Sequence, residues 1–177
     1  KLDLKISGLV KGFLGQGAVD LSPSPNGPFS VYKSSLGTLT YDNNTGMMKW
    51  QKDGALAVVS APKMMTIKDE TVIRIAKDFL VGHGPASVKD IRANYVVDHG
   101  VSEMGLPVVF AKTVVFHQLL SGLTPFASAG SVEVTVNAGG EVVAVSSSLI
   151  YATMLRLVEW VDTNTVYLRS EERRVGK

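Results

Sequence analysis

The chain contains no cysteine, which excludes disulfides, thiolate metal sites and a cysteine nucleophile. It also lacks an apolar run of the roughly 18 residues that a membrane-spanning helix needs. Its 18 basic and 16 acidic residues give a formal net charge of only +2, and the basic residues are dispersed. Nucleic acids and anionic membranes bind clustered basic faces, so we expect neither as a partner.

Signatures of the common enzyme classes are missing too. The sequence has no HExxH, no GxSxG and no GxxxxGK[ST]. Gly15 and Gly17 are followed by Asp20 where a dinucleotide site needs its third glycine. We therefore assign no catalytic residue and no cofactor, and we expect a binding or structural role.

A folded domain is nevertheless expected. Apolar residues make up 45% of the 177 positions and charged residues 19%, a composition typical of a packed core. The length suits one domain or two very small ones. Lys1 stands where an initiator Met is absent, so we interpret the chain as a mature or truncated piece of a longer protein, from which a signal or anchor is not excluded.

Changes in composition divide the chain into three parts. Residues 1–19 carry four glycines, which disfavour a long helix and indicate a connector, although Leu2, Leu4 and Ile6 alternate as in a strand. Residues 21–28 contain three prolines and predict a loop. We expect an N-terminal segment and linker over 1–28, a main domain over 29–150, and a C-terminal segment over 151–177.

Short strands and one helix are predicted for the first half of the main domain. Residues 29–61 are predicted to form short strands joined by tight turns at 42–46 and at Asp53-Gly54, which together make a small β-meander. Residues 66–81 have the apolar spacing of an amphipathic helix. Thr66 is the expected N-cap and Gly82 the expected end of this helix.

The second half of the domain is predicted to be β-rich. We expect a strand over 88–97, a turn at Asp98-His99-Gly100 and a strong strand over 107–117. Residues 131–136 and 141–147 form a hairpin pattern around Asn137–Gly140. Residues 150–161 fit either a short helix or a strand.

Histidines are the remaining candidates for chemistry. His99 and Glu103, with His117 as a distant third member, are a conceivable metal site, because imidazole and carboxylate are common zinc ligands. Solvated turn residues explain His99 and Glu103 equally well. His117 ends an apolar strand pattern, which favours a half-buried or edge histidine. His83 follows the helix in a Gly-His-Gly loop.

One group of residues resembles a known family. VVFHQ (114–118), SGLTP (121–125), GSVEVTV (130–136) and GEVV (140–143) are similar to PepSY and the related FTP propeptide modules. The matching motif positions are Phe116, Gln118, Gly122, Pro125 and Gly140. Thr124 and Phe126 depart from the family's turn. The resemblance covers about residues 29–150 and implies modules that assist and inhibit secreted proteases or regulate the cell envelope.

These observations lead to one fold and three functions. We expect an α+β fold, a twisted antiparallel sheet with one main helix packed on a face, preceded by the β-meander. The leading function is a non-enzymatic, extracytoplasmic PepSY-like module that binds a protein partner, such as a peptidase domain or an envelope protein. Alternatives are an extracellular structural subunit and a metal-dependent hydrolase using His99, His117 and Glu103. Residues 169–177 resemble translated adapter sequence, or else are a solvated charged end.

Overall fold

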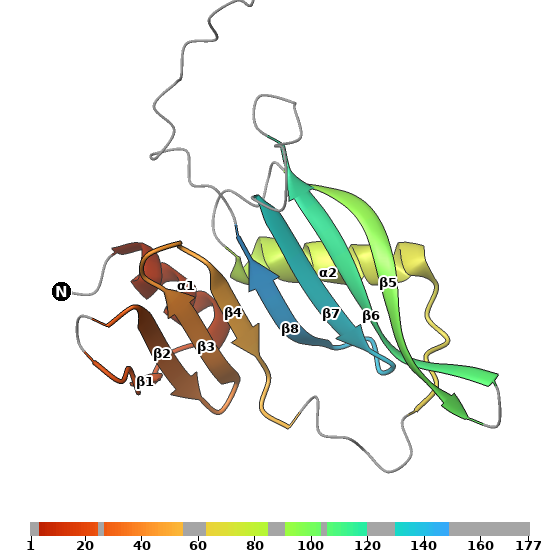
Figure 1. Ribbon diagram of the computed structural model, residues 1–177, viewed down its shortest axis with the longest axis horizontal. Coiled ribbons are helices and arrows are strands. Elements are labelled where there is room, and N and C mark those ends of the chain that lie inside the picture. Colours follow the sequence, from red (N-terminus) through yellow and green to blue (C-terminus); the bar gives the residue numbers. More distant parts are fainter. Residues whose placement is uncertain are drawn as a thin grey trace, which may run out of the picture.

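A single antiparallel sheet dominates the molecule (Figure 1). The computed structural model describes residues 4–24, 27–54, 63–84, 91–103, 106–119 and 130–148. Within them the order of the eight strands across the sheet is β1-β2-β3-β4-β8-β7-β6-β5, and two helices accompany it. The strands are β1 (Val19–Asp20), β2 (Phe29–Ser34), β3 (Gly37–Asp42), β4 (Met48–Gln51), β5 (Ile91–Glu103), β6 (Leu106–Gln118), β7 (Ser131–Asn137) and β8 (Val142–Ser147), and the helices are α1 (Leu4–Leu14) and α2 (Asp69–His83).

The sheet is two meanders joined at a central seam. Strands β1 to β4 follow one another in sequence, as do β8 to β5 in reverse. The seam is the pairing of β4 with β8, in which Trp50 lies opposite Val145. Residues almost a hundred positions apart in the sequence therefore become neighbours, and one sheet results where two separate ones were possible.

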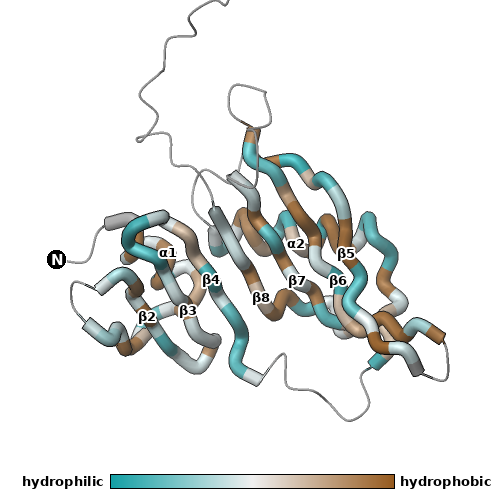
Figure 2. The backbone as a smooth tube through the Cα atoms, in the orientation of Figure 1, coloured by the Kyte–Doolittle hydropathy of each residue, from teal (hydrophilic) through white to brown (hydrophobic). Residues whose placement is uncertain are grey.

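The hydrophobic core lies on one face of this sheet, which we call the helix face because both described helices cover it (Figure 1). Cross-strand pairing aligns apolar side chains into a row that crosses the seam without a break. The row consists of Tyr32, Leu39, Trp50, Val145, Val134, Val114 and Val96. Apolar residues follow β6, β7 and β8 in Figure 2. Since strand side chains alternate between faces, each strand gives only every second residue to this core.

Helix α2 packs against β5 to β8, as its apolar spacing predicts. Val72, Ala76 and Leu80 are fully buried, and Phe79 is partly buried beside them. The expected N-cap is wrong, because the helix begins at Asp69 with Lys68 as N-cap and without a side-chain cap. The carboxylates of Asp69 and Glu70 in the first turn instead face the positive end of the helix dipole.

The connector predicted for residues 1–19 is wrong, because residues 4–14 form α1. Its buried residues recur at helical spacing, namely Ile6, Leu9, Phe13 and Leu14. Gly12 serves packing, because a Cβ on it would lie 2.4 Å from the carbonyl oxygen of His83. A glycine there allows α1 to approach the end of α2 closely, and this benefit outweighs its low helix propensity.

The expected α+β fold, with one main helix on a sheet preceded by a separate meander, is also wrong. The described residues form a sheet-dominated structure in which the meander is half of the sheet and carries its own helix. The physical reason is the seam, because the apolar positions of β4 continue the core row of β8. Hydrophobic burial is shared across both halves, so the meander is not an appendage.

Strands β6, β7 and β8 agree with the sequence pattern, whereas β5 does not. The turn predicted at residues 98–100 is wrong, because β5 runs from Ile91 to Glu103. A register irregularity between His99 and Gly100 takes the place of the turn. The hairpin of β7 and β8 is confirmed, with Gly140 at φ +77° in its turn. The expectations for residues 55–61 and 150–161 lie outside the described residues.

Candidate functional site: the β5 edge

The open face of the sheet, opposite the helix face, is polar. The row beside the core row runs through Lys33, Thr38, Gln51, Ala144, Thr135, Thr113 and Val97. Hydroxyl groups pair across its strands: the Oγ1 atoms of Thr113 and Thr135 lie 2.8 Å apart. Near the β5 edge this face carries the exposed apolar side chains of Tyr95 and Val97, with the buried Val115 of β6 opposite Tyr95. The open face is therefore more apolar at this part of the β5 edge than along the row through Thr113 and Thr135.

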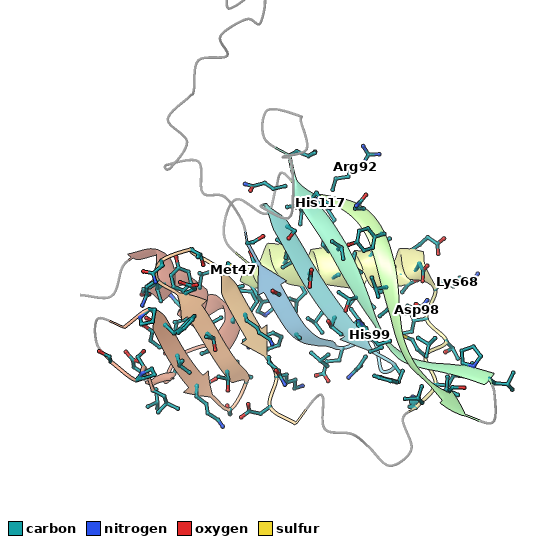
Figure 3. The ribbon with its side chains drawn as sticks, in the orientation of Figure 1. Met47, Lys68, Arg92, Asp98, His99 and His117 are labelled. Carbon is teal, nitrogen blue, oxygen red and sulfur yellow. The ribbon has the colours of Figure 1, made fainter. Side chains whose placement is uncertain are left out.

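His99 and His117 lie at different places on this face (Figure 3). His99 lies opposite Ala111 and His117 opposite Arg92, six residues apart along β6, which corresponds to about 20 Å. Glu103 lies opposite Leu106, four residues beyond His99 along β5. The structure does not bring these three residues together. No group of three potential metal-ligating residues occurs in the described ranges.

Each histidine has its own local surroundings. The Nε2 atom of His99 lies 2.7 Å from Oγ1 of Thr113, which links β5 to the hydroxyl pair on β6 and β7. His117 is half-buried, as expected, and its Nδ1 atom has no hydrogen-bond partner among the described residues. The ring of His83 stacks on Phe79 at 4.3 Å, and its Nδ1 lies 3.0 Å from the Phe79 carbonyl oxygen. The His99 contact connects two strands, whereas the His83 contacts lie within α2.

The residues that carry the family resemblance have structural surroundings. Phe116 is a buried core residue, and Gln118 is 4% exposed at the end of β6. A Cβ on Gly140 would lie 3.3 Å from Cδ1 of Ile67, so this glycine also leaves space for a neighbour. Gly122 and Pro125 lie outside the described residues. None of the three described motif positions offers reactive chemistry.

One ion cluster fixes β5 and α2 to the sheet on the helix face. Lys112 of β6 contacts the carboxylate of Asp69 at the start of α2, and its Nζ lies 3.5 Å from Asp98 of β5. The Lys112 side chain is only 14% exposed. The hydrogen bond to Asp69 raises the pKa of Lys112, against the opposing effect of partial burial, and Asp98 adds to the increase.

The two edges of the sheet differ in length. Edge strand β1 has two residues, whereas edge strand β5 has thirteen. Within the described ranges, β5 pairs only with β6, so its outer side carries a row of free backbone donors and acceptors. Short edge strands are one way in which proteins prevent unwanted pairing. The β1 edge is protected in this way, and the β5 edge is not.

Several apolar side chains are exposed along the β5 edge. Tyr95 is 52% exposed, Val97 39% and Val101 47%, and Leu106 at the start of β6 is 70% exposed. Single exposed apolar residues are common on protein surfaces, but Tyr95 and Val97 lie two residues apart on one face of the edge strand, and grouped exposed apolar residues indicate an interaction site. These side chains follow the edge on whose outer side no described strand pairs.

Two register irregularities limit the part of β5 that can accept another strand. They lie between Ala93 and Tyr95 and between His99 and Gly100. Bulges twist the edge and end regular pairing. The regular stretch between them, which we call the edge window, is Tyr95–His99. Tyr95, Val97 and His99 lie on the open face, and Val96 and Asp98 on the helix face.

Sequence reasoning missed this site. The alternation of Tyr95, Val97 and His99 was a usable signal, but Asp98-His99-Gly100 fits a turn equally well. The edge position of β5 follows from the order of all eight strands. Local pattern contains no information on which strand is outermost.

Comparison of the chain with protein-family models, with curated proteins and with solved structures finds no match. The resemblance to PepSY and FTP modules therefore has no support from these comparisons. Neither helix in the described ranges is long and apolar enough to cross a bilayer.

Proposed function

We propose that this protein is a non-enzymatic binding module that holds a protein partner by accepting an extended segment of it along β5. The observation that carries the proposal is a thirteen-residue edge strand with exposed apolar side chains and no strand on its outer side among the described residues. Strand addition is a common mode of peptide recognition, in which backbone hydrogen bonds supply affinity.

The edge window would determine which segments bind. Tyr95 and Val97 lie on the open face and favour apolar or β-branched residues opposite them, since cross-strand pairs of this kind stabilise a sheet. The ion cluster of Lys112, Asp69 and Asp98 supports the window from the helix face. A rigid, preorganised edge loses little conformational entropy when a partner binds.

The separation of the histidines supports a binding role over a catalytic one. His99 bonds from β5 to β6, His83 contacts Phe79 within its own helix, and these histidines do not surround a common point. A location outside the cytoplasm, with a peptidase domain or an envelope protein as partner, rests on the family resemblance alone. The binding proposal does not depend on it.

A peptide screen tests the proposal. Arrays of short extended peptides with alternating β-branched residues are probed with the wild-type chain and two variants. Val97→Lys places a charge in the edge window, and Val19→Lys places the same charge on β1, where Val19 is 58% exposed. We expect binding to be lost in the first variant and kept in the second.

Backbone chemistry provides a further control. N-methylation of alternate amides in a binding peptide removes donors and preserves the side chains, so it should abolish strand addition. Equal binding of methylated and unmethylated peptides, or equal binding by both variants, would contradict the proposal. A screen that finds no peptide whose binding depends on Val97 would also contradict the proposal.

A further inference from the structure

We infer that the segment accepted by the β5 edge carries a basic residue opposite Asp98 and apolar residues opposite Tyr95, Val96 and Val97. The inference rests on the proposed function, because it uses the same edge, and it names the chemistry of the partner. Asp98 becomes a specificity-determining residue of the edge window.

Asp98 is the acidic residue of the edge window, and its side chain is 55% exposed. Its cross-strand neighbour on β6 is Lys112, whose Nζ approaches it from the inner side of the strand at 3.5 Å. No described strand pairs with the outer side of β5. The carboxylate is therefore open toward the position that an added strand would take.

Lys112 is shared between two carboxylates, because it also contacts Asp69 at the start of α2. Its contact with Asp98 is the longer of the two. Lys68, the residue before α2, is exposed and forms no ion pair within the described ranges. A carboxylate accepts several hydrogen bonds, so Asp98 keeps both unused acceptor positions and an incompletely balanced charge.

Strand addition would remove the exposed side of Asp98 from water. Such a transfer is costly for a carboxylate unless a cation accompanies it. An apolar residue opposite Asp98 would leave this cost without compensation, and an acidic residue would add repulsion, since like charges directly opposite each other destabilise a sheet. A lysine or arginine at this position supplies the cation. The charge of Asp98 thus selects against most extended segments and favours those with a basic residue there.

The other residues of the window favour apolar partners. On the helix face, Val96 is partly buried and ends the core row, so an apolar residue opposite it would extend this row by one position. On the open face, Tyr95 and Val97 are exposed and favour β-branched partners. Every pairing in the described sheet is antiparallel. In an antiparallel segment the basic residue comes first and the apolar residues follow it.

Fluorescence anisotropy of labelled synthetic peptides with the full chain tests the inference. The peptides carry lysine, glutamine or glutamate at one variable position, followed by the apolar run Val-Ile-Val. We expect the lysine peptide to bind roughly fivefold more tightly than the glutamine peptide, a ratio that corresponds to about 1 kcal/mol for an opposite-charge cross-strand pair. The glutamate peptide should bind least, and added salt should reduce the preference.

Two variants separate the role of Asp98 from a general effect of charge. Asp98→Asn removes the charge and keeps the size of the side chain, so the lysine and glutamine peptides should bind it equally. Asp53→Asn is the matched control, because Asp53 is also about half exposed and lies 3.2 Å from a lysine, Lys33 of β2. It should keep the preference for lysine. Circular dichroism verifies that both variants are folded, and the peptide series on the wild type does not depend on them.

Equal binding of the lysine and glutamine peptides by the wild type would overturn the inference, as would a preference for lysine that persists in Asp98→Asn. If peptides without this preference still lose binding in Val97→Lys, the proposed function stands and only its specificity is wrong. If no peptide binds in a way that depends on Val97, the inference and the proposed function both fail.

Discussion

Phe79 lies where both helices meet the sheet. Its ring centroid is 6.0 Å from that of Phe13 in α1 and 5.5 Å from that of Trp50 in β4. Three elements from different parts of the chain therefore share one aromatic cluster. Such clusters combine apolar burial with favourable ring geometry.

Phe79→Ala should destabilise the fold by roughly 3 kcal/mol, the lower end of the usual range for a buried Phe, because Phe79 is only partly buried. Urea unfolding followed by circular dichroism measures the change. Val81→Ala, at a side chain that is 70% exposed in the same helix, is the control and should change stability by no more than about 0.5 kcal/mol. If Phe79→Ala lowers stability no more than Val81→Ala does, the aromatic cluster does not hold the two helices against the sheet.

Lys112 gives a prediction about pH. Its pKa is raised in the folded protein above the ordinary lysine value of 10.5, chiefly by the hydrogen bond to Asp69. Because the pKa of Lys112 is higher in the folded than in the unfolded protein, the ion cluster stabilises the fold fully at pH values below the pKa of the unfolded state. This stabilisation is lost as the pH rises through the pKa of the folded state. The stabilisation should thus be constant at neutral pH and decline only in the alkaline range.

Lys112→Met removes this dependence. We expect it to lower stability at neutral pH by about 1–2 kcal/mol, less than for a fully buried pair because Asp69 and Asp98 are about half exposed. Thermal unfolding of both proteins between neutral pH and pH values above 10.5 measures the difference. The two stability curves should converge at the alkaline end, and curves that stay parallel would argue against the ion cluster.

At the scale of elements, the β2–β3 hairpin depends on a glycine. Gly37 has φ +135°, a conformation that side chains rarely adopt, and a Cβ there would lie 2.3 Å from the Gln51 carbonyl oxygen. Gly37→Ala should therefore cost more than the roughly 1–2 kcal/mol of backbone strain alone.

Gly17→Ala separates strain from collision, because Gly17 has φ +88° and no atom within 4 Å of the added Cβ. This substitution should lower the free energy of unfolding by about 1 kcal/mol, which is the cost of a positive φ where the added Cβ meets no other atom. Chemical unfolding of both variants gives the comparison. If Gly37→Ala and Gly17→Ala lower the free energy of unfolding equally, the close contact with β4 does not restrict the residue at position 37.

The elements that sequence reasoning predicted correctly are those with local causes. α2 has an apolar stripe at helical spacing, and the β7–β8 hairpin has alternating valines around a glycine turn. α1 was missed because Gly8 and Gly12 lower helix propensity, whereas the packing of Gly12 against α2 is a tertiary effect. β5 was cut short because its end looks like a turn, and its pairing with β6 carries it through a bulge.

The candidate site was less predictable than the elements. Which strand is outermost depends on the seam between β4 and β8, and no local pattern connects Trp50 with Val145. Long-range pairing is decided by the apolar area that the whole sheet buries. The expected histidine site failed for a related reason, since distances along paired strands are set by register.

At the scale of the whole molecule, the seam predicts cooperative unfolding. The core row crosses from β4 to β8, and the Phe13–Trp50–Phe79 cluster joins both helices, so neither half can lose its structure without exposing the other's core. Trp50 lies at the seam and is 4% exposed, which makes it a reporter of this junction.

Trp160→Phe leaves Trp50 as the single tryptophan, since the chain has two. In this variant the fluorescence of Trp50 should change at the same denaturant concentration as the far-ultraviolet circular dichroism, because coincident transitions mark two-state unfolding. Fluorescence that changes at lower denaturant than the bulk of the secondary structure would mean that the seam opens first and that residues 4–51 are a separable unit.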